Sequence, residues 1–304
     1  SRAKIQAFID SGAVEVKRTQ RPHVSFGRMK ASAQVLTGDE VIVVSEKKPE
    51  PPVDFNYRII FEDEDLFVID KPGNLPVHPA GRYFFNTLLV HLRTHGHKTA
   101  LKADREYFLA HRIDRETSGI LVLTKNREST ANLARQFAER TTEKRYLAIT
   151  RGVPPQDFVV EEPMRRSKTS RIELKMEVAP RDAEDAQSAS TVYQRLEVEG
   201  DYALVQCAPK TGRQHQIRVH LDHAGFPIVG DKLYGMSESD AYRYFESKFL
   251  SPEAVARLKL PRHALHAAGI RFSHPTTGLP MEFDSPLPAD LRAFMNLQKE
   301  GLAP

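Results

Sequence analysis

The chain has 304 residues, of which 40% are hydrophobic and 28% charged, and its net charge is +4 at pH 7, so it can bury a substantial core in two domains or in one large and one small domain. No apolar run reaches the roughly 18–20 residues of a membrane span, and the N-terminus lacks the long apolar segment of a signal peptide, which excludes a membrane protein. The single cysteine, Cys207, excludes an internal disulfide and a multi-cysteine metal site, so we expect a cytoplasmic protein.

The N-terminal residues predict a small basic unit. A short helix with apolar residues on one face ends at Gly12, a strand follows at 13–18, and Gly38-Asp39 form a turn before an apolar strand. Charged residues and three prolines then predict a stiff, extended linker. We therefore expect a small domain at 1–45, a linker at 46–56 and a large domain at 57–304.

Beyond the linker, the pattern is mixed α and β. Helices are expected at 85–96, 130–140, 213–225 and 288–301, the second of them capped by Asn126 or Ser129. The expected strands are more numerous, and their order is irregular, which predicts an α+β fold with a large, mainly antiparallel mixed sheet flanked by helices and loops. They lie at 57–72 (two strands around an acidic turn), 119–126, 144–152, 171–178, 190–200, 202–210 and 265–275.

One segment, "LAHRIDRETSGILVLTKN" at 109–126, places a carboxylate among cations. Asp114 stands between Arg112 and Arg115, and a Thr-Ser-Gly turn at 117–119 leads into an apolar strand. Two cationic neighbours favour the ionised carboxylate, and the turn can present it at the beginning of the strand. An isolated aspartate between arginines is usually a surface ion pair, so this segment alone does not define a site.

Three further motifs change that interpretation. In chain order, the sequence contains "KPGNLPVHP" at 71–79, the segment around Asp114, "EKRYLAITRG" at 143–152 and "KTGRQHQIRVHLDHAGFPIVGDKLYG" at 210–235. Together they resemble the RluA-type pseudouridine synthases over roughly residues 54–290, and the second and fourth motifs are long enough to be specific. The N-terminal unit resembles the S4 RNA-binding module that often precedes this catalytic domain.

The resemblance implies a role for each matching residue. Asp114 occupies the position of the family's catalytic aspartate. Tyr146 matches the tyrosine that stacks on the target base and assists proton removal, and Arg218 matches the basic residue that pairs with the aspartate. Arg112 matches the arginine that fills the space of the flipped nucleotide. The expected substrate-binding residues are Arg112, His111, Arg115, Thr117, Ile217 and Arg213.

The sequence departs from the family pattern at a few positions. Ile113 stands where leucine is more usual, and Gln214 stands where threonine is common before His215. In the S4-like unit, Lys17-Arg18 replace the usual Asn-Gly turn, an extra stretch follows at 19–34, and the customary first helix is absent from this chain. We expect altered local hydrogen bonding at Gln214 rather than loss of activity.

The chemistry needs neither a cofactor nor a metal. Converting uridine to pseudouridine breaks the N1–C1′ bond and rejoins the base through C5, so nothing is oxidised and no fragment leaves the nucleotide. The chain has no P-loop, no dinucleotide-binding GxGxxG and no paired cysteines, and His215, His220 and His223 do not have the spacing of a standard metal-ligand pair. A carboxylate can act here as a nucleophile or as the base that removes the C2′ proton, and both roles remain open.

Two alternatives come from other classes of protein. A nucleoside or base hydrolase usually needs two carboxylates, and Glu116 is expected to face solvent or a basic neighbour. A catalytically silent RNA-binding protein would not need Asp114, Tyr146 and Arg218 together. The expected partner is therefore an RNA that contains the target uridine, either large-subunit ribosomal RNA, which the S4-like unit favours, or tRNA. The mild basicity is compatible with this partner, and a monomer suffices.

Overall fold

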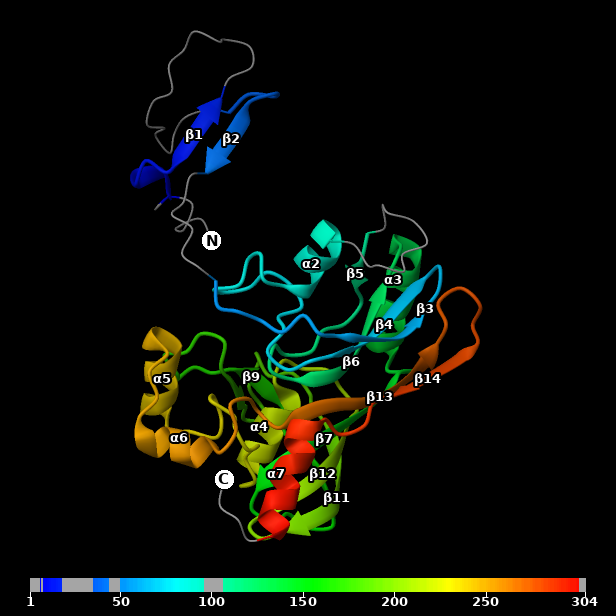
Figure 1. Cartoon of the computed structure of the whole chain (residues 1–304), viewed down its shortest axis with the longest axis vertical. Helices are drawn as coiled ribbons and strands as arrows, with labels where there is room; N and C mark the ends of the chain where they lie inside the picture. Colours follow the sequence, from blue (N-terminus) through cyan, green and yellow to red (C-terminus); the bar gives the residue numbers. More distant parts are fainter. Residues whose placement is uncertain (1–5, 7, 18–34, 44–49, 96–105, 301–304) are drawn as a thin grey trace. The chain divides into compact units, whose positions relative to one another are not determined.

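The chain divides into two compact units, residues 1–50 and residues 51–304. Predictions made for Arg18, the stretch 19–34, linker residues 46–49, residue 96 and residue 301 lie outside the described residues. The computed structural model describes residues 6, 8–17, 35–43, 50–95 and 106–300 (Figure 1).

The small unit contains a two-stranded antiparallel ribbon. Strand β1 (Val14–Lys17) pairs with β2 (Glu40–Val43). Gly12, at φ +75°, ends the preceding helical residues, and its N–H donates to the carbonyl of Ile9 at 3.0 Å. The turn before β2 contains Gly38, at φ +93°. Both glycines thus lie at element boundaries that the sequence predicts, Gly12 after the helical residues and Gly38 in the turn before β2, and each adopts a backbone conformation that other residues avoid.

The large unit is built on a ten-stranded sheet. Its described pairs are antiparallel except for one parallel pair, β6 with β13, so the predicted mainly antiparallel mixed sheet is confirmed. From edge to edge the strands are β3 (Arg58–Glu62), β4 (Leu66–Lys71), β6 (Ser118–Thr124), β13 (Leu265–Ser273), β7 (Glu143–Arg151), β12 (Tyr202–Pro209), β11 (Thr191–Glu199) and β8 (Asp157–Val160), with β5 (Phe108–Leu109) on β6 and β14 (Pro280–Asp284) on β13. A separate hairpin joins β9 (Met164–Arg166) to β10 (Met176–Val178).

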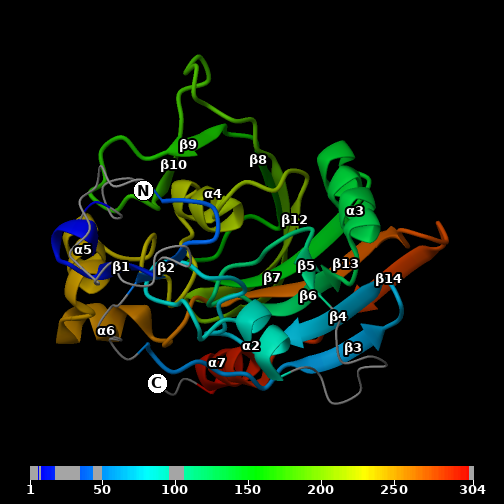
Figure 2. The same ribbon diagram turned by 90° about the horizontal axis from the view of Figure 1, so that it is seen from above.

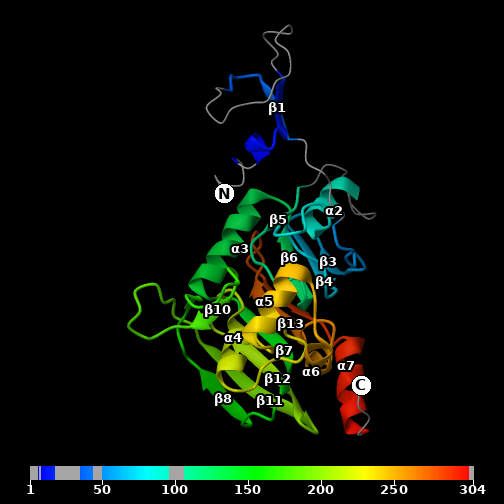
Figure 3. The same ribbon diagram turned by 90° about the vertical axis from the view of Figure 1, so that its left-hand side faces the viewer.

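Helices cover both faces of this sheet. Figures 2 and 3 show α2 and α3 on opposite sides of β4 and β6, and α4 and α7 on opposite sides of β7 and β12. Among the described helices, none is long and apolar enough to cross a membrane. The helices are α2 (Leu88–His95), α3 (Arg127–Glu139), α4 (Gln216–His223), α5 (Glu238–Ser247), α6 (Pro252–Leu258) and α7 (Ala289–Lys299).

Strand β4 shows how the apolar pattern places the core. Leu66 and Val68 pack against the residues beneath α3, whereas Phe67 and Ile69 pack on the opposite face beneath α2. Successive side chains of a strand point to opposite faces, so a strand that is covered on both sides is apolar throughout.

The division between the two units falls within the predicted linker, and residues 51–56 belong to the larger unit. Val53 and Phe55 lie in the expected linker, yet both pack against the core beneath α2, and the ring of Phe55 stacks on His91 at a centroid distance of 4.3 Å. The packing of these apolar side chains holds the end of the predicted linker against the sheet.

Other differences are local. The strand expected at 171–178 is extended only at 176–178, because the hydroxyl of Ser170 accepts from the N–H of Ile172 at 3.0 Å and the chain turns there. The sequence patterns predict no element at α5 and α6. Each begins with a serine N-cap, Ser237 and Ser251, and Pro252 follows in the first turn of α6.

Candidate active site

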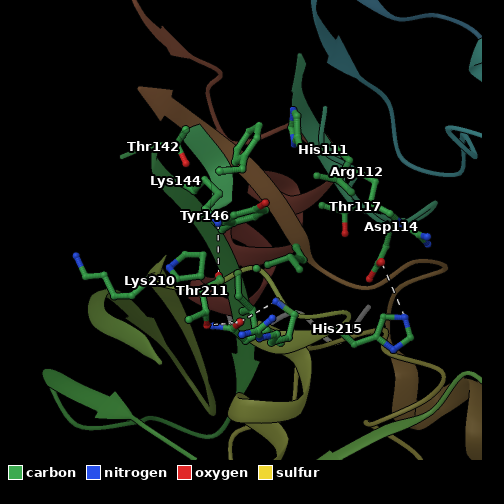
Figure 4. A pocket seen from close by; sticks show the side chains of 18 of the residues that line it. His111, Arg112, Asp114, Thr117, Thr142, Lys144, Tyr146, Lys210, Thr211 and His215 are labelled. Carbon is green, nitrogen blue, oxygen red and sulfur yellow. Dashed lines mark hydrogen bonds and ion pairs between the residues drawn. The ribbon is translucent and has the colours of Figure 1, made fainter. Parts of the chain in front are cut away.

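A cavity of about 430 Å³ opens on the face that carries α3 and α4. Its walls come mainly from three segments of the chain, residues 110–117 before β6, residues 137–146 from the end of α3 into β7, and residues 209–218 from the end of β12 into α4 (Figure 4). Leu265 of β13 completes the lining. These segments include parts of the last three sequence motifs. The volume lies in the usual range for a small-molecule site.

The loop that carries Asp114 is fixed on both sides. Ile113, only 7% exposed, is anchored in the core beneath α2. The N–H of Thr117 donates to the carbonyl of Asp114 at 3.2 Å, and the Thr117 hydroxyl lies 2.8 Å from Nε2 of His263. The "TSG" turn therefore closes behind the aspartate and ties it to the segment before β13.

The last residue of that turn, Gly119, has to be a glycine. It sits at φ +106°, and a Cβ at this position would lie 2.2 Å from the carbonyl oxygen of Ala267. This is where β6 and β13 pair in parallel. Only glycine permits both the backbone conformation and the close approach.

Lys71 joins the first motif to the same loop. Its side chain is fully buried and donates to three carbonyl oxygens, those of Pro72 at 2.8 Å, Leu75 at 3.1 Å and Arg115 at 3.0 Å. Burial, reinforced by the charge of Arg262, lowers the pKa of Lys71 to about 7. Two chain segments that are more than 40 residues apart are thereby held together behind Asp114.

The Asp114 carboxylate has unlike neighbours at its two oxygens. Oδ2 accepts a hydrogen bond from Nη1 of Arg218 at 2.8 Å, while Oδ1 faces Nε2 of His215 at 3.9 Å (Figure 4). Burial alone would raise the pKa of Asp114, but the surrounding basic groups, His215 and Arg218 first, hold that pKa well below 3.8. The carboxylate is ionised at neutral pH.

Arg218 is itself held in place by a second carboxylate. Its Nε and Nη2 donate to the two oxygens of fully buried Asp231 at 2.6 and 2.9 Å, and the ring of Tyr234 lies 5.0 Å from its guanidinium carbon. The same carboxylate accepts from the N–H of Leu233 at 2.9 Å. Because this two-point pair fixes the guanidinium, Nη1 is left to bind Asp114 in a defined direction.

Tyr146 lies in the middle of the sheet, on β7, opposite Cys207 of β12 and Ala267 of β13. Its side chain lines the cavity. Burial and then the charge of Asp114 raise the pKa of Tyr146, so the phenol is neutral at neutral pH. It offers a flat aromatic face and a hydroxyl beside an ionised carboxylate.

Most of the predicted site residues line this cavity. His111 is committed to structure, since its Nε2 accepts from the N–H of Val122 at 2.9 Å and its ring lies against Phe137. Thr117 bonds to His263, and Arg213 donates from Nε to the carbonyl of Ser188 at 3.0 Å. Their roles in substrate binding remain predictions. The predicted residues in the lining are Asp114, Tyr146, Arg218, Arg112, His111, Thr117, Ile217 and Arg213.

Arg115 is the exception, because its side chain does not contribute to the cavity wall. Its guanidinium binds Glu116 at 2.7 Å and also contacts Asn74 and Tyr83. Glu116 in turn accepts from Nζ of Lys232 at 2.9 Å, so it faces basic neighbours, which is one of its two predicted environments. Adjacent side chains of an irregular loop point in different directions, and the sequence pattern could not show which one enters the site.

The sequence patterns did not assign a role in the site to several residues. Gln216 accepts from the Thr211 hydroxyl at 2.7 Å and from the N–H of Arg213 at 3.0 Å, which ties the loop before α4 together. Asp231 reads as a turn residue in "GDKLYG", although it also fixes Arg218. His215 has the left-handed conformation, φ +58°, and its side chain turns toward Asp114. Gln216, Asp231 and His215 all lie in the fourth motif, and the length of that motif was the sign in the sequence that they contribute to the site.

These groups define what the cavity can do chemically. Asp114 is the only carboxylate among the described residues that line it. Arg218 binds this carboxylate, His215 faces it, and Tyr146 lines the same cavity. In the described part of the chain, His, Cys, Asp and Glu side chains do not gather as metal ligands would. One ionised carboxylate beside a neutral phenol suits covalent attack on, or proton removal from, a bound organic ligand.

Comparisons with known proteins identify the family. The model of the RNA pseudouridylate synthase family matches residues 65–223. A "Ribosomal large subunit pseudouridine synthase D" of Nitrosomonas europaea is 34% identical over 97% of this chain and 79% of its own length. An "Uncharacterized RNA pseudouridine synthase" of Chlorobaculum parvum is 35% identical over 97% of this chain and 89% of its own. The solved structure of human RNA Pseudouridylate Synthase Domain Containing 4 matches with a TM-score of 0.60 at 29% identity, over 80% of this chain and 92% of that one. The chain belongs to the RNA pseudouridylate synthase family.

Proposed function

We propose that this protein isomerises uridine to pseudouridine in large-subunit ribosomal RNA and that Asp114 carries the reaction. The observation that supports this most directly is the pair of Asp114 and Arg218 in the cavity, beside the ring of Tyr146. Several similar proteins are named Ribosomal large subunit pseudouridine synthase C or D, and these names support ribosomal RNA over tRNA as the substrate.

The proposed chemistry uses a single carboxylate. Asp114 either attacks C1′ of the uridine, forming an ester bond that breaks when C5 displaces the carboxylate, or removes the proton at C2′ and later returns it. In both cases the N1–C1′ bond breaks, the base rotates, C1′ bonds to C5, and N1 takes up a proton in place of the one that C5 loses. The proton on C5 is then released. Arg218 keeps Asp114 ionised and oriented, and Tyr146 stacks on the base and assists removal of that proton.

The target uridine must leave its helix to reach Asp114. Extruding a stacked base costs a few kcal/mol, which stacking on Tyr146 and insertion of Arg112 into the vacated space would offset. Arg112 is exposed on the cavity wall, and among the described residues no carboxylate pairs with it. Three other cations of the wall, Arg140, Lys144 and Lys210, likewise have no carboxylate partner among the described residues, and we assign them to the RNA phosphates.

We assign a separate role to each of the two units. Residues 57–304 form the catalytic domain, together with the linker residues that pack on it. Residues 1–45 act as the S4-like RNA-binding module that adds affinity for structured RNA. We further propose that the protein acts as a monomer in the cytoplasm.

Release of tritium tests the function in vitro. Large-subunit ribosomal RNA transcribed with 5-tritiated uridine should release tritium to water with the native protein and not with Asp114→Asn. The mass of the RNA separates isomerisation from hydrolysis, because only hydrolysis sets uracil free. Tight binding of RNA with no tritium release would instead favour a silent RNA-binding protein.

A further inference from the structure

Tyr234 and His215 form a buried pair directly behind the catalytic carboxylate. The Tyr234 hydroxyl lies 2.8 Å from Nδ1 of His215, and their rings meet edge to face at a centroid distance of 5.7 Å. Tyr234 is 6% exposed, and the His215 side chain is 7% exposed. Neither residue has a part in the reaction as proposed above.

The contacts of the Tyr234 hydroxyl determine which ring nitrogen of His215 carries the proton. The N–H of Met176 donates to this hydroxyl oxygen at 3.0 Å, so the hydroxyl still has its own proton to donate. Among the contacts of the described residues, Nδ1 of His215 is the acceptor available for it. A buried hydroxyl donates where it can, because an unmade hydrogen bond is costly. Nδ1 is then an acceptor, and the proton of the neutral imidazole is on Nε2.

That Nε2–H faces the catalytic carboxylate. It lies 3.9 Å from Oδ1 of Asp114, the oxygen that Arg218 does not bind. This separation exceeds a hydrogen bond by less than 1 Å, and contacts of this kind commonly shorten when a substrate enters. His215 precedes α4 with no side-chain capping bond and with the left-handed φ of +58°, a strained conformation that turns its ring toward Asp114.

A neutral donor suits this position better than a cation does. Arg218 already lowers the basicity of Asp114, and a second positive charge would weaken the carboxylate further as a base or nucleophile. Burial, and then the charge of Arg218, lower the pKa of His215 to about 4. The negative charges of Asp114 and Asp231 oppose this shift, and the charge of Arg112 adds to it. The ring is therefore uncharged at neutral pH.

We propose that Tyr234 holds His215 as the Nε2–H tautomer and that this N–H closes on Oδ1 of Asp114 when the nucleotide enters. The carboxylate is then fixed at both oxygens, by Arg218 and by His215, with a lone pair left on each for the reaction. His215 and Tyr234 are positioning residues, since they act through Asp114. The kinetic consequences rest on the proposed function, whereas the tautomer does not.

The tautomer of His215 can be determined by NMR, without an activity assay. In protein labelled with ¹⁵N-histidine, His215 should give the nitrogen shifts and couplings of an Nε2–H imidazole, and His215→Asn identifies its signals among the 12 histidines. Tyr234→Phe should change that pattern, whereas Tyr202→Phe, a tyrosine that packs on Phe294 outside the cavity, should not. An Nδ1–H tautomer in the native protein, or an unchanged pattern in Tyr234→Phe, would overturn the proposal.

Chemical rescue tests the N–H itself. Glycine and asparagine both tolerate φ +58°, so His215→Gly and His215→Asn remove the ring without adding backbone strain. His215→Gly should lower kcat by roughly one to two orders of magnitude with little change in KM. Imidazole should restore kcat, whereas 1-methylimidazole, which has no N–H in its neutral form, should not. Native kcat in His215→Gly, or equal rescue by both compounds, would contradict the proposal.

The pH profile separates positioning from mere packing. In Tyr234→Phe, Nδ1 loses its donor and can take up a proton, so kcat should gain an acid limb and fall as the pH decreases below neutrality; the native enzyme should show no such limb above about pH 5. His215→Asn should lack this limb, because its neutral amide can donate but cannot titrate. A protein that binds RNA but isomerises no uridine would refute the proposed function, and the NMR measurement would still decide the Tyr234–His215 arrangement.

Discussion

At the scale of single residues, Asp114 and Arg218 act as a unit with Asp231. Arg218 uses two nitrogens for Asp231 and one for Asp114. Because the stronger, two-point pair does not involve Asp114, the guanidinium keeps its position if the Asp114 carboxylate is changed. Activity and site architecture can therefore be separated by mutation.

The first prediction uses that separation. Asp114→Asn should lower the rate of pseudouridine formation by on the order of 10⁴-fold or more, since the amide is neither nucleophile nor base. Its affinity for RNA should stay near that of the native protein, because Arg218 is still held by Asp231. Single-turnover assays and filter binding measure the two quantities. A variant that retains native turnover would end the assignment of Asp114.

A second prediction concerns acid stability. The pKa of Asp231, like that of Asp114, is lowered in the folded protein: burial opposes ionisation, but the charge and hydrogen bonds of Arg218 outweigh it. The stabilisation is therefore present above the unfolded value of 3.8 and is lost as the pH falls below it. The free energy of unfolding, from urea titrations between pH 3 and 7, should decline toward acid.

Asp231→Asn should flatten that decline and reduce stability at pH 7 by about 3 kcal/mol or more, because it leaves a buried guanidinium without its main partner. Asp182→Asn, a change at an exposed aspartate, serves as the control and should alter neither quantity. Equal acid dependence in Asp231→Asn and the native protein would show that the buried pair does not titrate with folding.

At the scale of elements, the parallel contact between β6 and β13 delivers Asp114 to the cavity. The contact depends on Gly119, where a Cβ would meet the Ala267 carbonyl at 2.2 Å. Gly119→Ala should destabilise the fold by more than about 3 kcal/mol, from steric overlap and from the positive φ together. Gly200 is the matched control, since it has a φ of +57° and no atom lies within 4 Å of the position that its Cβ would take.

Gly200→Ala should cost only about 1 kcal/mol, the penalty for a left-handed alanine. Thermal or urea unfolding of the two variants gives the comparison. If both substitutions cost the same, the close approach of β6 and β13 contributes nothing to stability, and the explanation of Gly119 fails.

Local patterns in the sequence predicted much of the fold. Apolar runs predicted β4, β6, β7 and β12, and Asn126 caps α3 as one of the two predicted caps, accepting from the N–H of Ser129 at 2.7 Å. Periodicity and caps act within a few residues, so they are visible in a single sequence. Helices α5 and α6 were missed because each is short and its serine cap is not followed by a long apolar stripe.

Such local patterns predicted less of the candidate site. Asp114 and Arg218 are 104 residues apart, and no local signal pairs them. The resemblance to a family brought them together, and the structure then added Asp231 and His215, whose importance depends on which atoms face Arg218 and Asp114. The direction of a side chain such as Arg115 follows from packing across the whole domain, which a linear motif does not encode.

At the scale of the whole molecule, the net charge of +4 is small, so local excess charge must attract the RNA. Lys144 and Lys210 on the cavity wall have no carboxylate partner among the described residues. By contrast, Arg271, on the neighbouring surface, pairs with Glu282 at 2.7 Å. Unpaired cations release counterions when they bind phosphate, and paired ones do so less.

RNA affinity should therefore fall steeply with salt. Lys144→Ala and Lys210→Ala should each reduce the slope of log K against log salt concentration by about 1. Arg292→Ala, which removes a cation paired with Glu197 away from the cavity, should leave the slope nearly unchanged. Filter binding at several salt concentrations measures this. A flat response in the native protein would argue against a polyanionic substrate.

The central claim is that Asp114 makes pseudouridine in large-subunit ribosomal RNA. The most direct measurement is a pseudouridine map of total RNA, by carbodiimide labelling and primer extension, from cells of the source organism with and without this gene. We expect one or a few sites in large-subunit ribosomal RNA to disappear, and to return with the native protein but not with Asp114→Asn. Sites lost only from tRNA would contradict the proposed substrate, and a map that is unchanged by loss of the gene would contradict the proposed activity.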